Sequence, residues 1–402
     1  TEEFNFGTPE YSPDSFPGNF TSVGGGNFFF TAYSSIEYPS EIADFADQTR
    51  LGGIELWFSD GTETGTKSIR INNQEYQIYN PVSGSYSPPG LFEENYTASG
   101  SSFPRELTAF QNTLYFTANN GKDGFELWSI SSNGNENSLK QVKDINPKAS
   151  SNPKELTVVG KNLYFTADSG SGQKLFLLKA GKNNKPKPVK NSGKNPQNLT
   201  EINDTLYYSA VSGKGREPWI AQGAKANQLQ DINPGTASSN PSNFEYIDKK
   251  NNNQKQNLLF FTANNGKKGF ELWSKNLNKK NDRSSLFDDI YPGLPSSYPG
   301  DLMNSNEALF FSADDSKSGR ELWTIDFPID DQENNNEAAG GDQSEDGEGN
   351  NGSGSGNKSE DDSSLIKNIK PGKASSNPAF LHNQQGKLYF SADNGKYGDE
   401  VW

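Results

Sequence analysis

A short two-part pattern recurs along the chain and limits the folds that the chain can adopt. The first part is an aromatic or leucine-led stretch ending in Thr/Ser-Ala, and it occurs at 28–32, 114–118, 163–167, 206–210, 259–263, 309–313 and 388–392. The second part is similar to Glu-Leu-Trp and follows each copy after a polar loop. All six tryptophans stand at this position of the repeat, and Phe176 takes the seventh. Such self-similarity is typical of folds in which each copy is one supersecondary unit.

The spacing of the copies predicts a β-propeller. Four of the six intervals between successive copies are near the 40–50 residues of a four-stranded propeller blade, and the two longer intervals contain insertions. Between copies, segments such as DINPGTASSNP at 231–241 end one strand, turn on Asn-Pro and Pro-Gly, and open the next strand. We therefore expect an all-β fold, namely a single seven-bladed β-propeller of four-stranded antiparallel blades over residues 1–402.

The aromatic residues have a structural interpretation in this fold. The Leu-Tyr-Phe-Thr-Ala strand is apolar or aromatic on both faces, as expected for a strand that is covered on both sides. We expect the repeated tryptophan to pack between neighbouring blades. The composition agrees with many short strands packed through aromatic faces, because only 31% of the residues are hydrophobic while 12% are aromatic.

The two ends of the chain complement each other. The seventh copy stops at Trp402, before a fourth strand. Near the other end, Glu3 to Phe6 precede the turn Ser15-Phe16-Pro17, in the order in which a fourth strand precedes the Ser-Ser-Asn-Pro turns. We expect residues 2–6 to supply the outer strand of the last blade and to close the ring, which removes two exposed sheet edges. Because Thr1 replaces an initiator Met, we expect a processed mature protein or an excised fragment.

Residues 54–66, IELWFSDGTETGT, resemble the bacterial ELWxxDGT repeat. The LYFTA-to-ELW part and the DIxPGxxSSxP part match that repeat over nearly the whole chain, whereas the Asp-Gly-Thr part occurs only at 60–62. Other turns can replace Asp-Gly in a hairpin, so this departure leaves the fold in place. Proteins that carry such repeats are mostly secreted or surface proteins of bacteria with no known catalytic residue set. The resemblance therefore implies an extracellular or cell-surface protein.

Several kinds of chemistry have little support. The chain has no cysteine, and its only histidine, His382, is best explained as a solvated surface residue, so neither a catalytic triad nor a zinc site is expected. No stretch approaches 18 apolar residues, so no transmembrane segment is expected. The net charge is −14, of which about −10 lies in an acidic, Gly/Ser/Asn-rich insertion at 330–362. This balance argues against nucleic acid as a partner.

Two recurring sets of oxygen-bearing residues need an explanation. We expect the repeated glutamates to bond a turn or pair with a lysine in each blade, because a ligand site normally interrupts a pattern; they are Glu55, Glu126, Glu217, Glu271, Glu321 and Glu400. The turns at 167–170, 313–316 and 392–395 place Asp and Asn oxygens beside glycine or serine. Such turns can bind Ca²⁺, although local Asx-turn bonding explains them equally well. Calcium is thus the one cofactor hypothesis.

The first repeat carries two long loops that are candidates for partner binding. The loop at 33–50 joins the second and third strands, and the loop at about 71–100 joins the first blade to the next, so both emerge on the same face of a propeller. The insertion at 330–362 belongs to the opposite face. Aromatic residues amid polar loops favour a protein or glycan interface. The candidate partner-binding residues are Tyr38, Phe45, Tyr76, Tyr79, Tyr86, Phe92 and Tyr96.

These observations favour a non-catalytic extracellular or cell-surface module that binds a protein or a glycan, as part of a surface layer, an appendage or an adhesive assembly. One alternative is a polysaccharide lyase or glycosidase that uses carboxylates in the propeller channel. That alternative requires a blade-specific cluster near the first strands, which are dominated by Leu, Thr, Val and Phe. Another alternative is a purely structural tile that self-assembles.

Overall fold

The structure is a computed structural model, and it describes residues 15–34, 53–71, 78–80, 85–87, 101–181, 185–251, 254–279, 281–306, 308–325 and 363–402. Regular structure in these residues consists of β-strands and one 3-10 turn, η1 (Glu136–Ser138). None of the described segments forms a helix with the length and apolar character needed to cross a bilayer. The chain divides into two compact units, Thr1–Leu206 with Ala221–Asn227, and Tyr207–Ile220 with Gln228–Trp402.

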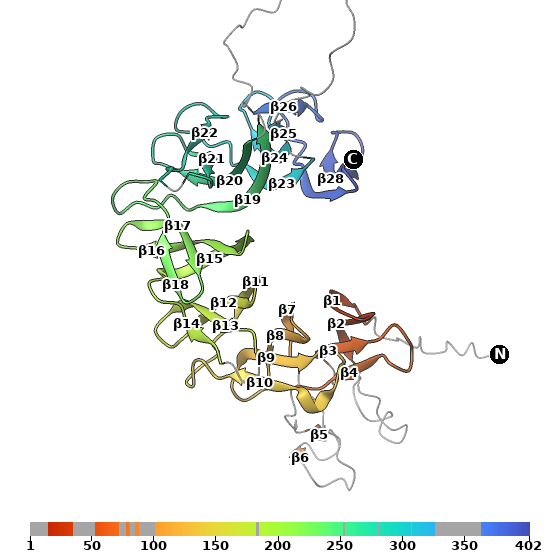
Figure 1. The fold of residues 1–402 in the computed structure, drawn as a ribbon. Helices are drawn as coiled ribbons and strands as arrows, with labels where there is room; N and C mark the ends of the chain where they lie inside the picture. The colour runs from red at the N-terminus through yellow and green to blue at the C-terminus, as the bar shows by residue number, and fades with distance from the viewer. Residues whose placement is uncertain are drawn as a thin grey trace, which may run out of the picture. The chain divides into compact units, whose positions relative to one another are not determined.

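Unit 1 holds three complete sheets and part of a fourth, coloured red to green in Figure 1. The first sheet has the order β1 (Gly18–Gly24), β2 (Asn27–Ser34), β3 (Gly53–Ser59), β4 (Lys67–Ile69). The second contains β7 (Arg105–Phe110), β8 (Thr113–Asn119), β9 (Phe125–Ser131) and β10 (Lys140–Lys143). The third contains β11 (Lys154–Val159), β12 (Asn162–Asp168), β13 (Gln173–Lys179) and β14 (Lys187–Pro188). A separate hairpin pairs β5 (Ile78–Asn80) with β6 (Ser85–Ser87).

The division between the units falls within the fourth sheet, β15 (Lys194–Ile202), β16 (Thr205–Ser212), β17 (Gly215–Gln222) and β18 (Lys225–Gln228). Unit 2 continues with a sheet of β19 (Ser242–Asn251), β20 (Gln254–Asn264), β21 (Phe270–Asn276) and β22 (Ser285–Asp288). The sixth sheet contains β23 (Gly300–Ser305), β24 (Ala308–Asp314), β25 (Arg320–Ile325) and β26 (Ser364–Lys367). The last has three strands among the described residues, β27 (Ala379–Gln384), β28 (Lys387–Asp393) and β29 (Asp399–Val401).

The sequence repeat corresponds to the sheets. Each Thr/Ser-Ala stretch lies in the second strand of a sheet, and each Glu-Leu-Trp-like stretch lies in the third. The neighbouring strands pair antiparallel, as in β8 with β9 and β24 with β25. In the second to sixth sheets the interior of the second strand is largely buried, for instance Leu163 to Ala167 of β12, whereas β28 of the last sheet buries only Ala392. The expectation of an all-β fold of four-stranded antiparallel units is therefore confirmed, and second strands covered on both sides are observed in the second to sixth sheets.

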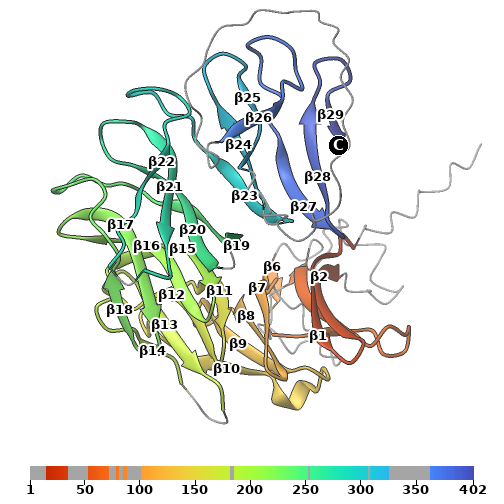
Figure 2. The ribbon, with the colours of Figure 1, turned by 45° about the horizontal axis from the view of Figure 1, so that its top comes forward.

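Within each unit, the first strands of successive sheets lie side by side. In unit 1, β1 lies against β7, β7 against β11, and β11 against β15; in unit 2, β19 lies against β23 and β23 against β27. Figure 2 shows strands of one sheet as ribbons beside one another, for instance β11, β12, β13 and β14. Because the first strand is also one edge of its sheet, successive sheets bring the same edge together, as the blades of a propeller do.

A repeated backbone feature precedes each sheet. The turn that leads into each sheet contains a proline. The residue before this proline has a positive φ of 42–48°, and the residue three positions after that one has a φ of 53–59°. The seven pairs are Phe16 and Asn19, Phe103 and Glu106, Asn152 and Glu155, Asn195 and Asn198, Asn240 and Asn243, Tyr298 and Asp301, and Asn377 and Phe380. A register shift accompanies the second residue, as between Gly300 and Met303 on β23. A β-bulge of this kind bends the strand as it enters the sheet.

The hydrophobic cores lie between neighbouring sheets. In unit 1, Leu114 and Phe116 of the second sheet pack with Phe29 and Leu56 of the first. In unit 2, Trp323 of the sixth sheet joins a cluster with Phe260 of the fifth. The indole N–H also donates to the alanine carbonyl of the adjacent second strand in five repeats, and from Trp323 this bond to Ala313 measures 3.2 Å. The prediction that the repeated tryptophan packs between sheets is confirmed by these contacts.

Some expected features lie outside the described residues. They include residues 2–6, the insertion at 330–362, and Tyr38, Phe45, Tyr76, Phe92 and Tyr96. The two long loops of the first repeat are described only at their ends and in the β5–β6 hairpin, where Tyr79 and Tyr86 are register partners. At the start of the second loop, Ile71 is 5% exposed and belongs to the core of the first two sheets.

Candidate functional site

The repeated glutamates of the third strands are buried and bonded to serines. Glu271 on β21 is fully buried, and its carboxylate accepts from the Ser297 main-chain N–H (2.8 Å), the Ser297 hydroxyl (2.5 Å) and the Ile290 N–H (3.0 Å). Ile290 follows the fourth strand of the same sheet, and Ser297 opens the next sheet. The glutamate thus fastens the connector between two sheets. We call this arrangement the Glu–Ser clasp.

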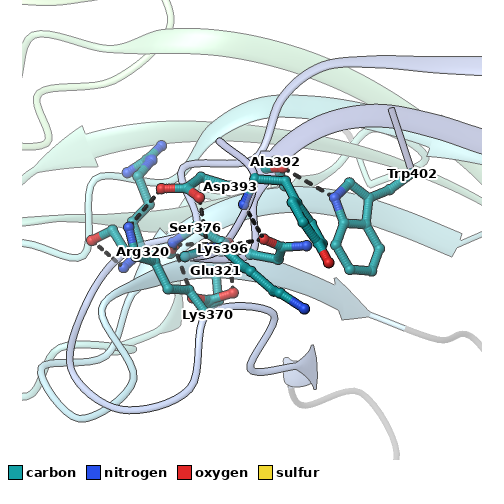
Figure 3. A network of polar contacts seen from close by, with 12 residues as sticks. Arg320, Glu321, Lys370, Ser376, Ala392, Asp393, Lys396 and Trp402 are labelled. Carbon is teal, nitrogen blue, oxygen red and sulfur yellow. Dashed lines mark hydrogen bonds and ion pairs between the residues drawn. The ribbon is translucent and has the colours of Figure 1, made fainter. Parts of the chain in front are cut away.

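The same clasp recurs in both units. It joins Glu55 to Ser102, Glu126 to Ser151, Glu217 to Ser239 and Glu321 to Ser376. Figure 3 shows the last of these, beside the Lys370–Asp393 ion pair and the bond from Trp402 to Ala392. The prediction that these glutamates bond a turn is confirmed for these five. Glu400 differs, because it is exposed and accepts a bond from Asn394 (3.3 Å).

Burial changes the acidity of the clasp glutamates. Desolvation raises the pKa of Glu55 and Glu271 to about 7, against the opposing effect of the serine hydrogen bonds. It raises the pKa of Glu126 and Glu217 as well. Glu245 on β19 is a further, half-buried carboxyl whose pKa desolvation raises to about 7 against a main-chain bond from Tyr246. In the clasps the shifts follow from a structural position, because the carboxylates are occupied by serine donors.

The turns between second and third strands use their oxygens locally. Asp168 Oδ1 accepts from the N–H groups of Gly170 (2.8 Å) and Gly172 (3.2 Å), and Asp315 Oδ1 accepts from Ser318 (2.7 Å). Asp393 accepts from Gly395 and pairs with Lys370. The Asx-turn explanation of these side chains is confirmed. The described residues contain no group of three or more His, Asp or Glu side chains arranged to hold a metal ion.

His382 lies on β27, where its side chain is exposed and faces Gln384 at 3.4 Å. The equivalent position on β11 is Thr157, as the register of the two first strands shows. The expectation of a surface histidine is confirmed.

A groove of about 810 Å³ lies at one end of the second and third sheets in unit 1. It is lined by the turn at 111–112 between β7 and β8, by residues of the turn between β9 and β10, and by Ala180, Gly181 and Lys185 between β13 and β14. In an antiparallel sheet these turns lie at the end opposite to the turns between second and third strands. The groove is therefore at the opposite end from the predicted aromatic loops. Its volume is within the range of about 300–1,000 Å³ of small-molecule sites.

The lining of the groove is polar around an aromatic floor. Phe110, Tyr115 and Val142 belong to the core between the two sheets, with the rings of Phe110 and Tyr115 6.0 Å apart. Neutral hydrogen-bonding side chains surround them, namely Gln111, Asn112, Thr113, Ser129, Ser131 and Ser138. Tyr115 is half-buried, and desolvation raises the pKa of its hydroxyl.

The contrast between two equivalent tyrosines explains why the groove exists. Tyr164 is the equivalent of Tyr115 in the next repeat, and its hydroxyl donates to the Gly223 carbonyl at 2.8 Å. Gly223 lies in the tight turn between β17 and β18, so that turn fills the space above Tyr164. The corresponding segment between β13 and β14, residues 180–186, is longer in sequence, and its described residues Ala180, Gly181 and Lys185 line the groove beside Tyr115. Among the residues that the structure describes, none hydrogen-bonds the Tyr115 hydroxyl.

Two lysines give the groove its charge. Lys140 and Lys185 both line it and are exposed, and the described part of the chain offers neither of them an ion-pair partner. Glu136, which lies in the turn between β9 and β10, does not line the groove and pairs with Lys67 at 2.9 Å. The described lining residues include neither Asp nor Glu. The groove is therefore locally basic on a chain whose net charge is −14.

None of the groove residues was among the candidate residues predicted from the sequence. Two signals point to them in retrospect. The segment KAGKNNKPKP at 179–188 concentrates lysines between two strands, and its length exceeds that of the equivalent turn QGAK at 222–225. Neither signal indicates a groove until the neighbouring sheet is placed against it.

Comparison with known proteins shows similarity in structure only. No family model matches the chain, and no curated protein sequence matches it. A structure from a study of two prolyl endopeptidases matches with a TM-score of 0.41 and 10% identity, over 96% of this chain and 46% of that one. This chain therefore spans about half the length of that protein.

Two further solved structures are similar. The β-propeller domain of the Trilobed protease from Pyrococcus furiosus, described as having an open velcro topology, matches with a TM-score of 0.39 and 8% identity, over 96% of this chain and 92% of that one. The BP39L lectin from Burkholderia pseudomallei matches with a TM-score of 0.36 and 12% identity, over 76% of this chain and 80% of that one. All three TM-scores are below 0.5, so the description of the fold rests on the sheets themselves.

Proposed function

We propose that this chain is a non-catalytic binding module that acts outside the cell or on the cell surface and recognises a saccharide. The observation that carries the proposal is the groove between the second and third sheets. A half-buried tyrosine ring at its floor, ringed by neutral amides and hydroxyls, suits a ligand with many hydroxyl groups and an apolar ring face. The extracellular location is supported by the resemblance of the repeats to the ELWxxDGT repeat.

A non-catalytic role is supported by the use of the conspicuous carboxylates. Five glutamates of the third strands accept hydrogen bonds from serines of the next connector. On the first strands, Glu106 accepts from the Glu155 N–H (2.8 Å), and Glu155 accepts from the Leu199 N–H (2.8 Å). These carboxylates hold backbone donors, which is a structural role.

The experiment is to measure the retention of the chain on a printed panel of neutral and acidic oligosaccharides. We expect retention that Tyr115→Ala and Gln111→Ala both reduce at least about tenfold. Gln111 is exposed, so its substitution tests the groove even where loss of the Tyr115 ring perturbs the fold. Tyr397→Ala is the matched control, because Tyr397 is 64% exposed in the turn between β28 and β29. The absence of any retention, or retention that neither groove variant changes, would contradict the proposal.

We also propose that the seven sheets are the blades of one seven-bladed propeller, closed by residues 2–6 beside β29. Features at each end support closure. In unit 1, Phe16 has a φ of 42°, as does the residue before the proline that precedes every other sheet, within a few degrees. The Ser15 carbonyl accepts a hydrogen bond from the Tyr33 N–H (2.7 Å), just as the Ser102 carbonyl accepts one from the Asn119 N–H. In unit 2, Glu400 stands at the clasp position with an exposed side chain. Ser15 is thus the serine that a seventh clasp requires.

The exposed apolar side chains at the two ends agree with closure. On the first sheet, Phe20 is 62% exposed and stacks on Phe30 at 5.3 Å. On the last sheet, Tyr389 is 41% exposed and Val401 is 82% exposed. At the other junctions, side chains at equivalent positions are buried, such as Phe116, which is equivalent to Phe30, and Leu322, which is equivalent to Val401. Closure would cover both sheet faces and both edges.

A further inference from the structure

The chemical character of the groove narrows the class of saccharide that it would bind; this step rests on the binding function proposed above. The groove presents three kinds of group together: one aromatic ring, a set of neutral amides and hydroxyls, and two ammonium groups. An uncharged saccharide would use the first two kinds and would leave the ammonium groups in water. A saccharide that carries acid groups would use all three.

The position of the lysines makes them part of the groove. Lys140 opens β10 and is the register partner of Ser129 on β9, whose side chain also lines the groove. Lys185 approaches from the segment between β13 and β14, so the two ammonium groups come from adjacent sheets. Because both lysines lack ion-pair partners among the described residues, a ligand carboxylate would not have to displace an internal one.

The net charge of the chain opposes the binding of anions everywhere except at a local basic site. A chain with a net charge of −14 repels anions at long range, so its general field would not collect an acidic polymer. Attraction of an anion to this chain requires a local basic site that lacks carboxylates. The groove is such a site.

We propose that the groove binds an acidic saccharide containing uronic acid residues. The carboxylate of one sugar residue binds Lys140 and Lys185, while a sugar ring lies on Tyr115. The Tyr115 hydroxyl bonds a hydroxyl of the ligand, as the equivalent Tyr164 hydroxyl bonds the Gly223 carbonyl. Gln111, Asn112 and Ser131 provide further hydrogen bonds at the rim.

The test compares charge and chemistry on the full chain. Oligomers of galacturonate, glucuronate and mannuronate are titrated calorimetrically, each beside its methyl ester, which removes the charge and retains the sugar. We expect at least one acid oligomer to bind at least about tenfold more tightly than its ester. We expect Lys140→Gln with Lys185→Gln to abolish that preference. The control is Lys122→Gln with Lys148→Gln, which removes the same charge from exposed positions at the opposite end of the second sheet.

The possible outcomes separate this inference from the proposed function. Binding of acid and ester with equal affinity, still lost in Gln111→Ala, would overturn the acidic ligand and leave saccharide binding in place. Retention of neutral saccharides without retention of any acidic one would likewise overturn the acidic ligand and leave saccharide binding in place. No groove-dependent binding of any saccharide would overturn both. If the control pair reduces the preference for the acid as strongly as Lys140→Gln with Lys185→Gln, the preference comes from the overall charge of the chain, and the inference is overturned.

Discussion

A buried glutamate usually destabilises a protein, because removal of a carboxylate from water costs free energy that the native state has to offset. In the Glu–Ser clasp the offset comes from hydrogen-bond donors, with two main-chain N–H groups and one hydroxyl directed at the carboxylate of Glu271. The glutamate also satisfies these donors, because the N–H groups of Ile290 and Ser297 would otherwise be buried without an acceptor. The serine is therefore as necessary as the glutamate.

The clasp should contribute strongly to stability. Glu271→Ala leaves three donors near Ser297 and Ile290 without an acceptor, and we expect it to lower the free energy of unfolding by about 2–4 kcal/mol. Ser297→Ala, which retains the main-chain bonds, should lower it by about half as much. Urea denaturation followed by tryptophan fluorescence measures both variants. A loss below about 0.5 kcal/mol for Glu271→Ala would contradict this role.

The raised pKa values predict an unusual dependence of stability on pH. Because the folded pKa of Glu55, Glu271 and Glu245 is about 7, above the value near 4.5 in the unfolded chain, the folded state holds more protons between these values. The stability that these three carboxyls contribute is then fully present below about pH 4.5 and is lost as the pH rises through about 7. We expect a decrease of at least about 1 kcal/mol from pH 5 to pH 8, measured by urea denaturation. Glu245→Gln should flatten the slope, and a rise in stability over this interval would refute the assignment.

At the scale of strands and turns, the length of one turn decides whether the space beside a sheet is filled or open. The tight turn between β17 and β18 brings the Gly223 carbonyl to Tyr164, whereas the longer segment after β13 leaves the groove above Tyr115. Loops tolerate such differences in length because little of the core depends on them. A repeat can thus keep its sheets while one junction becomes a site.

This difference between equivalent tyrosines can be measured. Tyr164→Phe removes the hydroxyl that donates to Gly223 and leaves the carbonyl without that donor, so we expect a loss of about 1 kcal/mol in the free energy of unfolding. Tyr115→Phe removes a hydroxyl with no partner in the described chain, so stability should change by less than about 0.3 kcal/mol while saccharide binding weakens. Equal losses of stability in the two variants would argue against an open groove.

At the scale of the whole molecule, the ring closure proposed above would make the chain unfold as one cooperative body. If Ser15 and Glu400 form the seventh clasp, Ser15→Ala and Glu400→Ala should each lower the midpoint of thermal unfolding, and the double variant should lower it by less than the sum. If residues 2–6 are the outer strand of the last sheet, as proposed, deletion of residues 1–8 should lower it further. Thermal melts followed by circular dichroism provide the comparison. An unchanged midpoint for both Glu400→Ala and the deletion would contradict closure.

The sequence by itself determined the number of repeats, the strand order within each sheet and the turn-bonding role of five of the repeated glutamates. These properties are local: the alternation of side chains along a strand and the turn residues between strands act over a few residues. The Asx turns at Asp168 and Asp315 were predictable for the same reason. His382 could be placed on the surface because its equivalent in another repeat, Thr157, showed which strand it belongs to.

Only the tertiary structure decided which groups meet across a junction. The clasp joins a glutamate to a serine 22 to 55 residues later, and although both residues recur in every clasp, nothing in the sequence says that these two positions meet. The groove has no sequence pattern of its own, because it is formed by the space that a turn of one sheet leaves beside the next. Strands form where the sequence is periodic, whereas a binding groove forms where two neighbouring repeats differ, and that difference acts only once their sheets are packed together.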